Sequence, residues 1–302
     1  MGTPEFAVPS LERLLALDYP VVGVFTQPDR PKNRGMKLTA SPVKVCAQSH
    51  GLEVYQPSSF KKDPEAVEIL RGLQPDLIVV AAFGQILPQS VLDIPRYGCI
   101  NVHSSLLPKY RGAAPVNWAI LNGEKETGVT IMKLVLALDA GDILLQEKTE
   151  IAPEETADEL ISRLSRMGAD LLEQVIPEIE QGRLKPVPQD DAKSSYAPML
   201  TRDLSPMDWT RTAQELHDQV RGLIPWPVAS AELGGVRFKI YRTEVGKQNT
   251  DKEPGAVISA GNDGILVACG GGGTLRILEL QAPGKKRMPA ADYLRGHPAV
   301  FQ

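Results

Sequence analysis

The sequence predicts an α/β protein in which a Rossmann-like, mostly parallel sheet is followed by a β-barrel of the oligonucleotide-binding kind. Apolar runs at residues 77–82 and 98–103 alternate with helical patterns, which is typical of a parallel sheet covered by helices on both faces. After residue 235, short apolar runs follow one another with turns between them. This spacing is typical of a small Greek-key barrel.

The chain is long enough for two hydrophobic cores. It has 302 residues, and single cores seldom grow beyond about 250–300 residues. Between residues 182 and 206 the periodic pattern gives way to Pro, Ser, Asp and Lys, which we interpret as a linker. We therefore predict a first domain at residues 1–181, a linker at residues 182–206 and a barrel domain at residues 207–302.

Two positions in the first domain carry sequence signals for a helix boundary. Ser41 and Pro42 form a typical helix start, as an N-cap residue and a first-turn proline. Pro177 should kink or break the helical pattern of residues 156–181. We expect further helices around residues 11–15 and at 64–73 and 116–121, and strands at residues 21–26, 54–55, 77–82, 98–103, 128–134 and 143–149.

The second domain should begin with a helix and continue as strands. Pro225, Trp226 and Pro227 predict a rigid turn after that helix. We expect the helix at residues 212–222 and strands at residues 236–243, 255–259, 265–268 and 275–280.

The N-terminal residues depart from the expected architecture. A βαβ arrangement should place a strand before the first helix, but residues 1–6 form only a turn. The sheet predicted from this sequence therefore lacks its first strand. We expect a short apolar strand to be encoded in frame upstream of Met1.

Composition and motif content exclude several classes of protein. The net charge is −4 and 42% of the residues are hydrophobic, which is ordinary for a soluble globular protein. The three cysteines are far apart and form no C-x-x-C pair, so neither a zinc site nor a disulfide framework is predicted, and a cytoplasmic protein is expected. No P-loop, G-x-G-x-x-G or H-E-x-x-H motif is present.

Cations cluster in two segments. Arg30, Lys32, Arg34 and Lys37 lie in the loop predicted at residues 27–40. Lys285, Lys286 and Arg287 are consecutive in the second domain. Such clusters are either solvated surface or contacts to an anionic partner, and the charges alone leave both interpretations open.

Asn101 and His103 are the residues most indicative of chemistry. They are two apart in a predicted strand, so their side chains share one face. The strand ends at His103, and ligands of open α/β sheets bind at the carboxyl ends of strands. Asp139 lies in a loop that follows a later strand and could reach His103. An amide, an imidazole and a carboxylate together can bind an oxyanion and move a proton, although a structural Asn and His remain an alternative.

The chain resembles the folate-dependent formyltransferases at a series of motifs. Those around the polar residues are Asn101-Val102-His103, Ser105-Leu106-Leu107-Pro108, Tyr110-Arg111-Gly112 and Leu138-Asp139-x-Gly141. Further stretches resemble the branch that formylates methionine on initiator tRNA, at residues 2–7, 26–31, 41–44, 111–115, 225–227 and 282–286.

The resemblance implies a function and a set of site residues. It implies transfer of a formyl group from 10-formyltetrahydrofolate to the α-amino group of methionine on initiator tRNA, without a metal, by a monomer. Asn101, His103 and Asp139 would be catalytic, and Ser105, Leu106, Leu107 and Pro108 would line the folate site. Arg34, Lys37, Lys285, Lys286 and Arg287 would contact tRNA.

Two alternatives stay open at this point. A purine-pathway formyltransferase would share the Asn, His and Asp but would act on a small amine and would not need the barrel or the basic loop. A non-catalytic RNA-binding remnant would keep the basic segments but lose activity with its first strand. A formylation assay separates the enzymes from the remnant.

Overall fold

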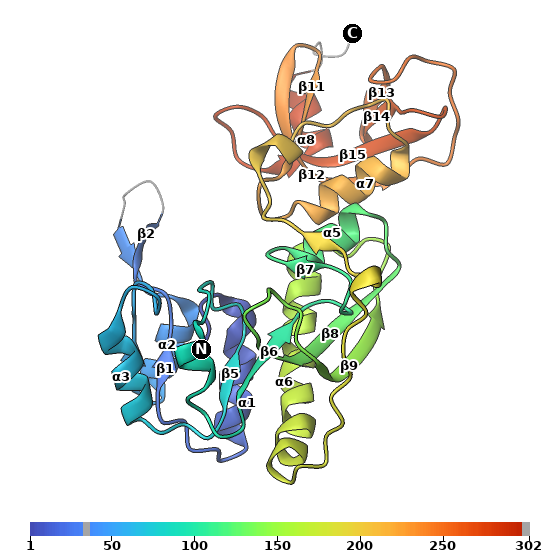
Figure 1. Ribbon diagram of the computed structural model, residues 1–302. Helices are drawn as coiled ribbons and strands as arrows, with labels where there is room; N and C mark the ends of the chain where they lie inside the picture. Colours follow the sequence, from blue (N-terminus) through green and yellow to red (C-terminus); the bar gives the residue numbers. More distant parts are fainter. Residues whose placement is uncertain (33–36, 298–302) are drawn as a thin grey trace. The chain divides into compact units, whose positions relative to one another are not determined.

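The computed structural model describes residues 1–32 and 37–297 (Figure 1). The chain forms two compact units. The first comprises residues 1–115, 126–150 and 161–197, and the second comprises residues 116–125, 151–160 and 198–302. The domains predicted from sequence were continuous segments of the chain. In the structure, residues 116–125 and 151–160 of the predicted first domain belong to the second unit. An α/β organisation with a β-rich C-terminal part is confirmed.

A four-stranded sheet forms the centre of the first unit. Its order is β5-β6-β8-β9, from strands β5 (Ile78–Val80), β6 (Cys99–His103), β8 (Glu126–Lys133) and β9 (Ile143–Glu150). Strands β5 and β6 are parallel, but β8 and β9 run antiparallel to their neighbours. The Rossmann-like organisation that we predicted is confirmed, but β8 and β9 depart from the mostly parallel arrangement because each runs antiparallel to its neighbour.

A second pair of parallel strands lies beyond β5. It consists of β1 (Val24–Phe25) and β4 (Val54–Tyr55). The N-terminal residues lie between this pair and β5, since Gly2 forms an isolated parallel bridge with Ala81. Its amide also donates to the Phe25 carbonyl at 3.0 Å. The predicted strand at residues 21–26 is thus reduced to two residues.

Local capping chemistry explains where several helices begin. The Ser41 hydroxyl accepts a 3.1 Å hydrogen bond from the Lys44 amide, directly before Pro42. Asp63 caps the following helix in the same way through the Ala66 amide. The helices of the first unit are η1 (Glu5–Ala7), α1 (Val8–Ala16), α2 (Pro42–Ser49), α3 (Pro64–Gly72), α4 (Gln89–Leu92), most of α6 (Ala157–Glu180) and η2 (Asp191–Lys193).

Helix α6 continues through Pro177, so of the kink or break that we predicted, the break is not found. The proline lies in the last turn of the helix, so any distortion that it causes affects only the end of the helix. Buried Leu172, Val175 and Ile176 hold this part of the helix in the core. Burial of three apolar side chains, at about 1.5–3 kcal/mol each, outweighs a cost of about 3 kcal/mol for an interior proline.

The basic segment is a β-hairpin and not the loop that we predicted. Strands β2 (Arg30–Lys32) and β3 (Lys37–Thr39) pair antiparallel. Arg34, expected at the tRNA, lies outside the described residues. Lys37 is described only by its backbone position in β3.

The segment at residues 182–206 has more structure than a linker requires. Strand β10 (Tyr196–Ala197) pairs in parallel with β7 (Arg111–Gly112). Val187 also bridges Ile143 at the edge of β9. These contacts attach residues 187–197 to the first unit, and η3 (Arg202–Leu204) follows in the second.

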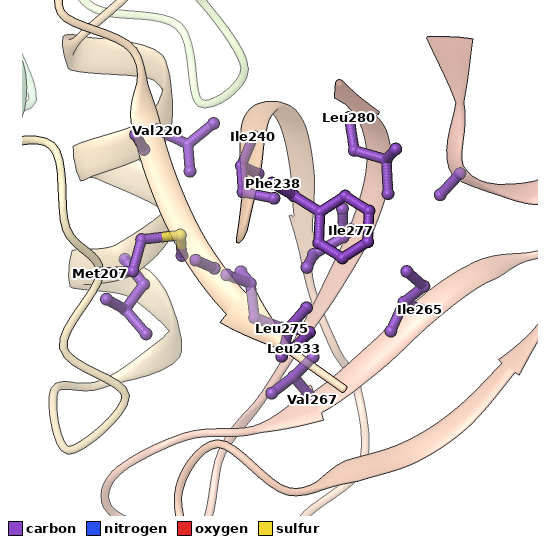
Figure 2. Packing of buried hydrophobic residues seen from close by; sticks show 14 of the residues in the cluster. Met207, Val220, Leu233, Phe238, Ile240, Ile265, Val267, Leu275, Ile277 and Leu280 are labelled. Carbon is purple, nitrogen blue, oxygen red and sulfur yellow. The ribbon is translucent and has the colours of Figure 1, made fainter. Parts of the chain in front are cut away.

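The second unit contains an antiparallel sheet with a helix-covered core (Figure 2). Its order is β11-β12-β15-β14-β13, and β16 also pairs with β15. Phe238, Ile240, Ile265 and Ile277 are fully buried in this core. Its strands are β11 (Ala229–Leu233), β12 (Val236–Val245), β13 (Val257–Gly261), β14 (Gly264–Ala268), β15 (Thr274–Gln281) and β16 (Met288–Pro289).

No strand pairing within residues 198–297 closes this sheet into the predicted barrel. Strands β11 and β13 remain at opposite edges. Closure depends on contacts between residues distant in sequence, which strand spacing does not specify.

Helices α5, α7 and α8 pack in the second unit. A capping box formed by Thr212 and Glu215 starts α7 (Ala213–Gly222), which confirms the helix predicted at residues 212–222. Helix α5 (Pro115–Leu121) is attached through Asn117, whose amide donates to the Gly222 carbonyl at 2.8 Å. Arg221 donates to the Glu155 carbonyl at 3.0 Å, which explains why residues 151–160 join this unit. Helix α8 (Ala290–Gly296) was not predicted.

Candidate active site

Strand β6 places Asn101 and His103 on the same face of the sheet. On the opposite face, Val102 packs so closely on helix α6 that a Cβ at Gly168 would lie 2.5 Å from its Cγ1. The two polar residues therefore point away from α6. They are 9% and 5% exposed. No hydrogen-bond partner of the Asn101 amide is found among the described residues, so this buried donor remains available to a ligand.

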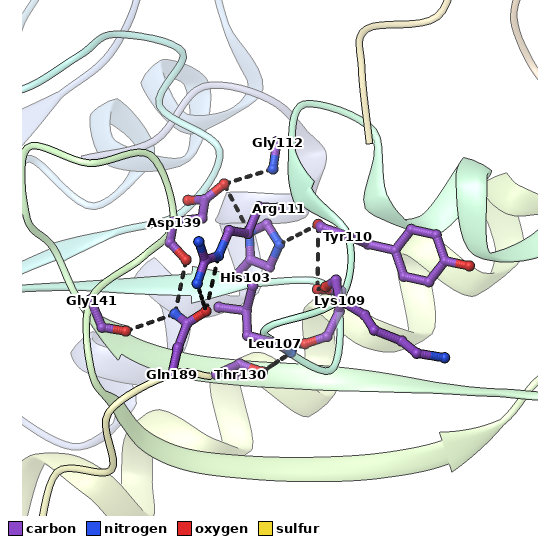
Figure 3. A network of polar contacts seen from close by, with 11 residues as sticks. His103, Leu107, Lys109, Tyr110, Arg111, Gly112, Thr130, Asp139, Gly141 and Gln189 are labelled. Carbon is purple, nitrogen blue, oxygen red and sulfur yellow. Dashed lines mark hydrogen bonds and ion pairs between the residues drawn. The ribbon is translucent and has the colours of Figure 1, made fainter. Parts of the chain in front are cut away.

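The ring of His103 is held by the loop that follows β6. Its Nε2 lies 2.9 Å from the main-chain oxygen of Tyr110 (Figure 3). A carbonyl only accepts, so Nε2 carries the hydrogen of this bond. Tyr110 has a φ of 61°, which turns the chain sharply at this point. The bond assigns His103 Nδ1 as the nitrogen that can exchange a proton with a substrate.

Asp139 faces this nitrogen. Its Oδ2 lies 3.7 Å from Nδ1 of His103, and both side chains are at most 10% exposed. At this distance there is no direct hydrogen bond, and the pair is an ion pair only while His103 is protonated. The same Oδ2 accepts a 2.8 Å hydrogen bond from the Gly112 amide. The structure thus brings together the His and Asp that the sequence singled out, and Asn101 lies two residues before His103 on the same face of β6.

Gly112 must be glycine for this contact to form. Its φ is 115°, outside the range of ordinary L residues, and a Cβ would lie 2.7 Å from the carbonyl oxygen of Ala197. The pairing of β7 with β10 therefore brings the Gly112 amide to Asp139.

Gln189 holds the backbone of the Asp139 loop. Its Nε2 donates to the main-chain oxygens of Asp139 and Gly141, at 2.8 and 2.7 Å. Its Oε1 accepts from Nη2 of Arg111 at 2.8 Å. Asp139 has a φ of 48°, a left-handed conformation that costs an aspartate of order 1 kcal/mol. The contacts of Gln189 compensate this cost and connect the loop to Arg111.

The segment expected at the folate site is only partly accessible. Ser105 is fully buried, and its hydroxyl donates to the Lys109 carbonyl at 2.7 Å. Leu107 is 3% exposed, and its amide donates to Thr130 Oγ1 at 3.2 Å. Leu106 and Pro108 are half-buried. Ser105 and Leu107 therefore shape the loop from inside, and Leu106 and Pro108 have more surface to offer a substrate.

The second basic cluster lies in an exposed turn before β16. Lys285, Lys286 and Arg287 are all exposed. Arg287 forms an ion pair with Glu279, and its guanidinium lies 4.7 Å from the centre of the Tyr241 ring. Lys285 and Lys286 have no acidic partner within residues 1–32 and 37–297, whereas the Glu279 carboxylate partly neutralises the charge of Arg287.

Several functional contacts were not predicted from the sequence. They involve the main-chain oxygen of Tyr110, the amide of Gly112 and the side chain of Gln189. The first two lie within a motif that was noticed only for its resemblance. Gln189 lies in the segment that we interpreted as a linker. Nothing in the polar sequence around it indicates a role at the site.

The geometry fits acyl transfer. The Asn101 amide can donate to an oxyanion, and Nδ1 of His103 can move a proton beside the Asp139 carboxylate. Among residues 1–32 and 37–297, no group of three or more His, Cys, Asp or Glu is placed to hold a metal ion. No helix in those residues has the length and apolar character needed to cross a membrane.

Residues 2–176 match the formyl transferase family, and residues 199–298 match the C-terminal domain of formyl transferases. The chain belongs to the formyl transferase family. It is 51% identical over 297 residues to a methionyl-tRNA formyltransferase of Clostridium novyi, a match that covers 98% of this chain and 96% of that one. A methionyl-tRNA formyltransferase of Trichlorobacter lovleyi is 52% identical, and the match covers 100% and 94% of the two chains.

Solved formyltransferases share the fold. A sugar 3N-formyl transferase, WlaRD, aligns with a TM-score of 0.69 at 21% identity and covers 94% of this chain and 97% of its own. An N-formyltransferase from Helicobacter canadensis aligns with a TM-score of 0.70 at 20% identity, with coverage of 93% and 97%. Both were crystallised with a formylated folate. At these identities the likeness supports the fold alone.

Proposed function

We propose that this formyl transferase moves a formyl group from 10-formyltetrahydrofolate to the α-amino group of methionine on initiator tRNA. The observation that carries the proposal is the position of the Asp139 carboxylate 3.7 Å from His103 Nδ1, at the end of a strand whose same face bears Asn101. Two relatives named methionyl-tRNA formyltransferase, which are 51% and 52% identical to this chain over nearly its full length, support the choice of acceptor.

The residues present suit the folate donor. A formyl oxygen needs a hydrogen-bond donor, and the buried Asn101 amide has no recorded protein partner. Leu106 and Pro108 expose apolar surface in the loop that follows the catalytic strand, where a flat ring can pack.

The three side chains account for each step of the transfer. The methionine nitrogen attacks the formyl carbon, and the carbonyl oxygen becomes an oxyanion that Asn101 and protonated His103 stabilise. The attacking nitrogen gives up one proton, which the Asp139 carboxylate can accept. Nitrogen N10 of the folate takes up one proton as its bond to the formyl carbon breaks, and His103 Nδ1 can supply it. Protons therefore balance within the His103–Asp139 pair.

The acceptor is large and anionic, and the chain has basic segments suited to it. We propose that Arg34, Lys37, Lys285, Lys286 and Arg287 contact phosphates of the tRNA. The second unit would assist this binding through a surface like that of an oligonucleotide-binding barrel, and the enzyme would act as a cytoplasmic monomer.

A direct comparison of acceptors tests the proposal. The purified chain is assayed with 10-formyltetrahydrofolate and either methionine-charged initiator tRNA or a ribosylated glycinamide of the purine pathway. We expect formylation of the tRNA only. Formylation of the small amine alone would support the purine-pathway alternative, and no transfer to either acceptor would contradict an enzymatic role. Asn101→Ala serves as the inactive control.

A further inference from the structure

Tyr196 presents an exposed aromatic ring beside the candidate active site. The residue is 61% exposed, although it belongs to strand β10, which pairs with β7. Its hydroxyl has no hydrogen-bond partner within residues 1–32 and 37–297. A tyrosine that packs into a protein usually buries its ring and pairs its hydroxyl. The ring of Tyr196 buries little of its surface in the first unit and can offer that surface to a ligand.

The backbone that carries Tyr196 is fixed by strand β7. The Arg111 amide donates to the Ser195 oxygen at 2.8 Å, and the Ala113 amide donates to the Ala197 oxygen at 2.9 Å. Ala197 is fully buried. Tyr196 lies between these two hydrogen bonds, so its main chain loses little freedom when a ligand binds.

The ring of Tyr196 lies directly against Gly112. A Cβ at Gly112 would be 2.6 Å from Cε2 and 3.1 Å from Cδ2 of the ring, so the ring occupies the space that a side chain at residue 112 would need. The Gly112 amide also donates to Oδ2 of Asp139 at 2.8 Å. Gly112 therefore contacts both the exposed ring and the carboxylate of the site.

In the proposed transfer, the acceptor approaches from the side of Asp139. This carboxylate accepts a proton from the methionine nitrogen, so the α-amine must lie beside it and hence near Gly112. Only the methionyl ester and the ribose separate that amine from the terminal adenine of a charged tRNA. The adenine is therefore within reach of the Tyr196 ring, whereas the folate has its own apolar surface at Leu106 and Pro108.

We propose that the Tyr196 ring stacks on the 3′-terminal adenine of the charged initiator tRNA and so directs the methionyl ester toward Asp139. This inference rests on the proposed function. Stacking suits this position because every nucleobase has an aromatic face, and an exposed tyrosine binds that face without a hydrogen bond. Tyr196 is thus a binding residue, and Asp139 and His103 carry out the proton transfers.

A double-mutant cycle between enzyme and tRNA tests the stacking. The parent chain and Tyr196→Ala are assayed with methionine-charged initiator tRNA and with the same tRNA lacking its terminal base. We expect Tyr196→Ala to raise the KM for the intact tRNA about tenfold, which is within the range of one stacked base. The KM for the abasic tRNA should change by less than about twofold, because the partner of the ring is then already absent.

Further variants separate the aromatic face from other properties of the side chain. Tyr196→Phe keeps the ring and should retain the parent KM, whereas Tyr196→Leu is apolar without a ring and should resemble Tyr196→Ala. Val187→Ala, at another exposed apolar residue of the segment attached to the first unit, is the matched control. The KM for the folate should stay within about twofold in all of these variants.

Fluorescence gives a measurement that needs no transfer. Charged initiator tRNA that ends in 2-aminopurine, mixed with the chain in the absence of folate, should lose fluorescence on binding the parent chain and Tyr196→Phe. It should not do so on binding Tyr196→Ala, since stacking on an aromatic ring is what quenches this base.

Three outcomes decide between the interpretations. An equal loss of activity on the intact and abasic tRNAs would overturn the proposal, because the ring would then act through Gly112 and not on the base. A raised KM for the folate with an unchanged KM for the tRNA would also overturn it, since the ring would then bind the donor. Absence of transfer by the parent chain would contradict the proposed function, and the fluorescence would still decide the stacking.

Discussion

The side chain of Gln189 donates a 2.8 Å hydrogen bond to the main-chain oxygen of Asp139, fifty residues earlier in the chain. It also binds the Gly141 oxygen and the Arg111 guanidinium (Figure 3). One amide therefore positions the loop that carries the carboxylate. The carboxylate is held in turn by the Gly112 amide, next to Arg111.

We expect Gln189→Ala to lower kcat about tenfold, because a loss of about 1.4 kcal/mol in positioning corresponds to one decade. Gln189→Glu should be as harmful, since a carboxylate cannot donate to the Asp139 and Gly141 oxygens. Gln181→Ala, at an exposed glutamine, is the matched control. Steady-state assays should find the KM for folate within about twofold. A purely structural role would instead lower the melting temperature and leave kcat unchanged.

Asn101→Ala should lower kcat by about 10²-fold or more, as the loss of an oxyanion donor does. The Asn101 amide has no recorded protein partner, so its removal should leave the melting temperature within a few degrees of the parent. His103→Ala should lower kcat at least as much, but it also removes the contact to the Tyr110 oxygen. Wild-type turnover in Asn101→Ala would contradict its assignment as a catalytic residue.

Asp139→Asn separates charge from shape. The new amide oxygen can still accept from the Gly112 amide, but the negative charge beside His103 is lost. We expect kcat to fall by roughly 10- to 100-fold, in the range of general acid–base contributions. Asp142→Asn, in the same loop, is the control. If both variants keep full activity, Asp139 is a structural residue.

Stability should depend on pH through the Met1 amine. Burial lowers the pKa of this amine to about 5, from an ordinary value of 8.0. Between these values the unfolded chain binds the extra proton, so stability rises with pH across this window and is lost as pH falls from 8 to 5. The change should be about 1–4 kcal/mol, because Met1 is only half-buried and solvent screens part of the effect.

Urea unfolding at several pH values measures this effect, with an N-terminally acetylated chain as the control. The free energy of unfolding of the acetylated chain should not change with pH between 5 and 8. Carboxylates with lowered pKa, such as that of Asp29 beside Lys44, lose their contribution only at lower pH. A slope of equal size in the acetylated chain would assign the effect to another group.

The affinity for initiator tRNA should depend on salt concentration through the phosphate contacts proposed for the second unit. Lys285→Ala with Lys286→Ala should reduce the slope of log affinity for initiator tRNA against log salt by about two. Arg287→Ala should reduce it by less than about one, since Arg287 is already paired with Glu279. Lys247→Ala with Lys252→Ala is the charge-matched control. An unchanged slope in the first double variant would identify the cluster as solvated surface.

The order of most elements follows from the sequence, as does the choice of Asn101, His103 and Asp139 as the residues that we propose to be catalytic. Periodicity located β6 and α7, because alternation and capping are local properties. The spacing of two between Asn101 and His103 was sufficient to place them on one face, since a strand has a period of two.

The tertiary structure alone decided the contacts that make the site specific. Local patterns did not predict that β8 pairs antiparallel with β6. They also did not predict that α6 continues beyond Pro177. Sequence could not reveal that Gln189, in a polar stretch, binds the Asp139 loop. It could not reveal that Tyr110 fixes the ring of His103. These contacts join residues that are near in space because of packing, and a short-range pattern contains no information about such pairs.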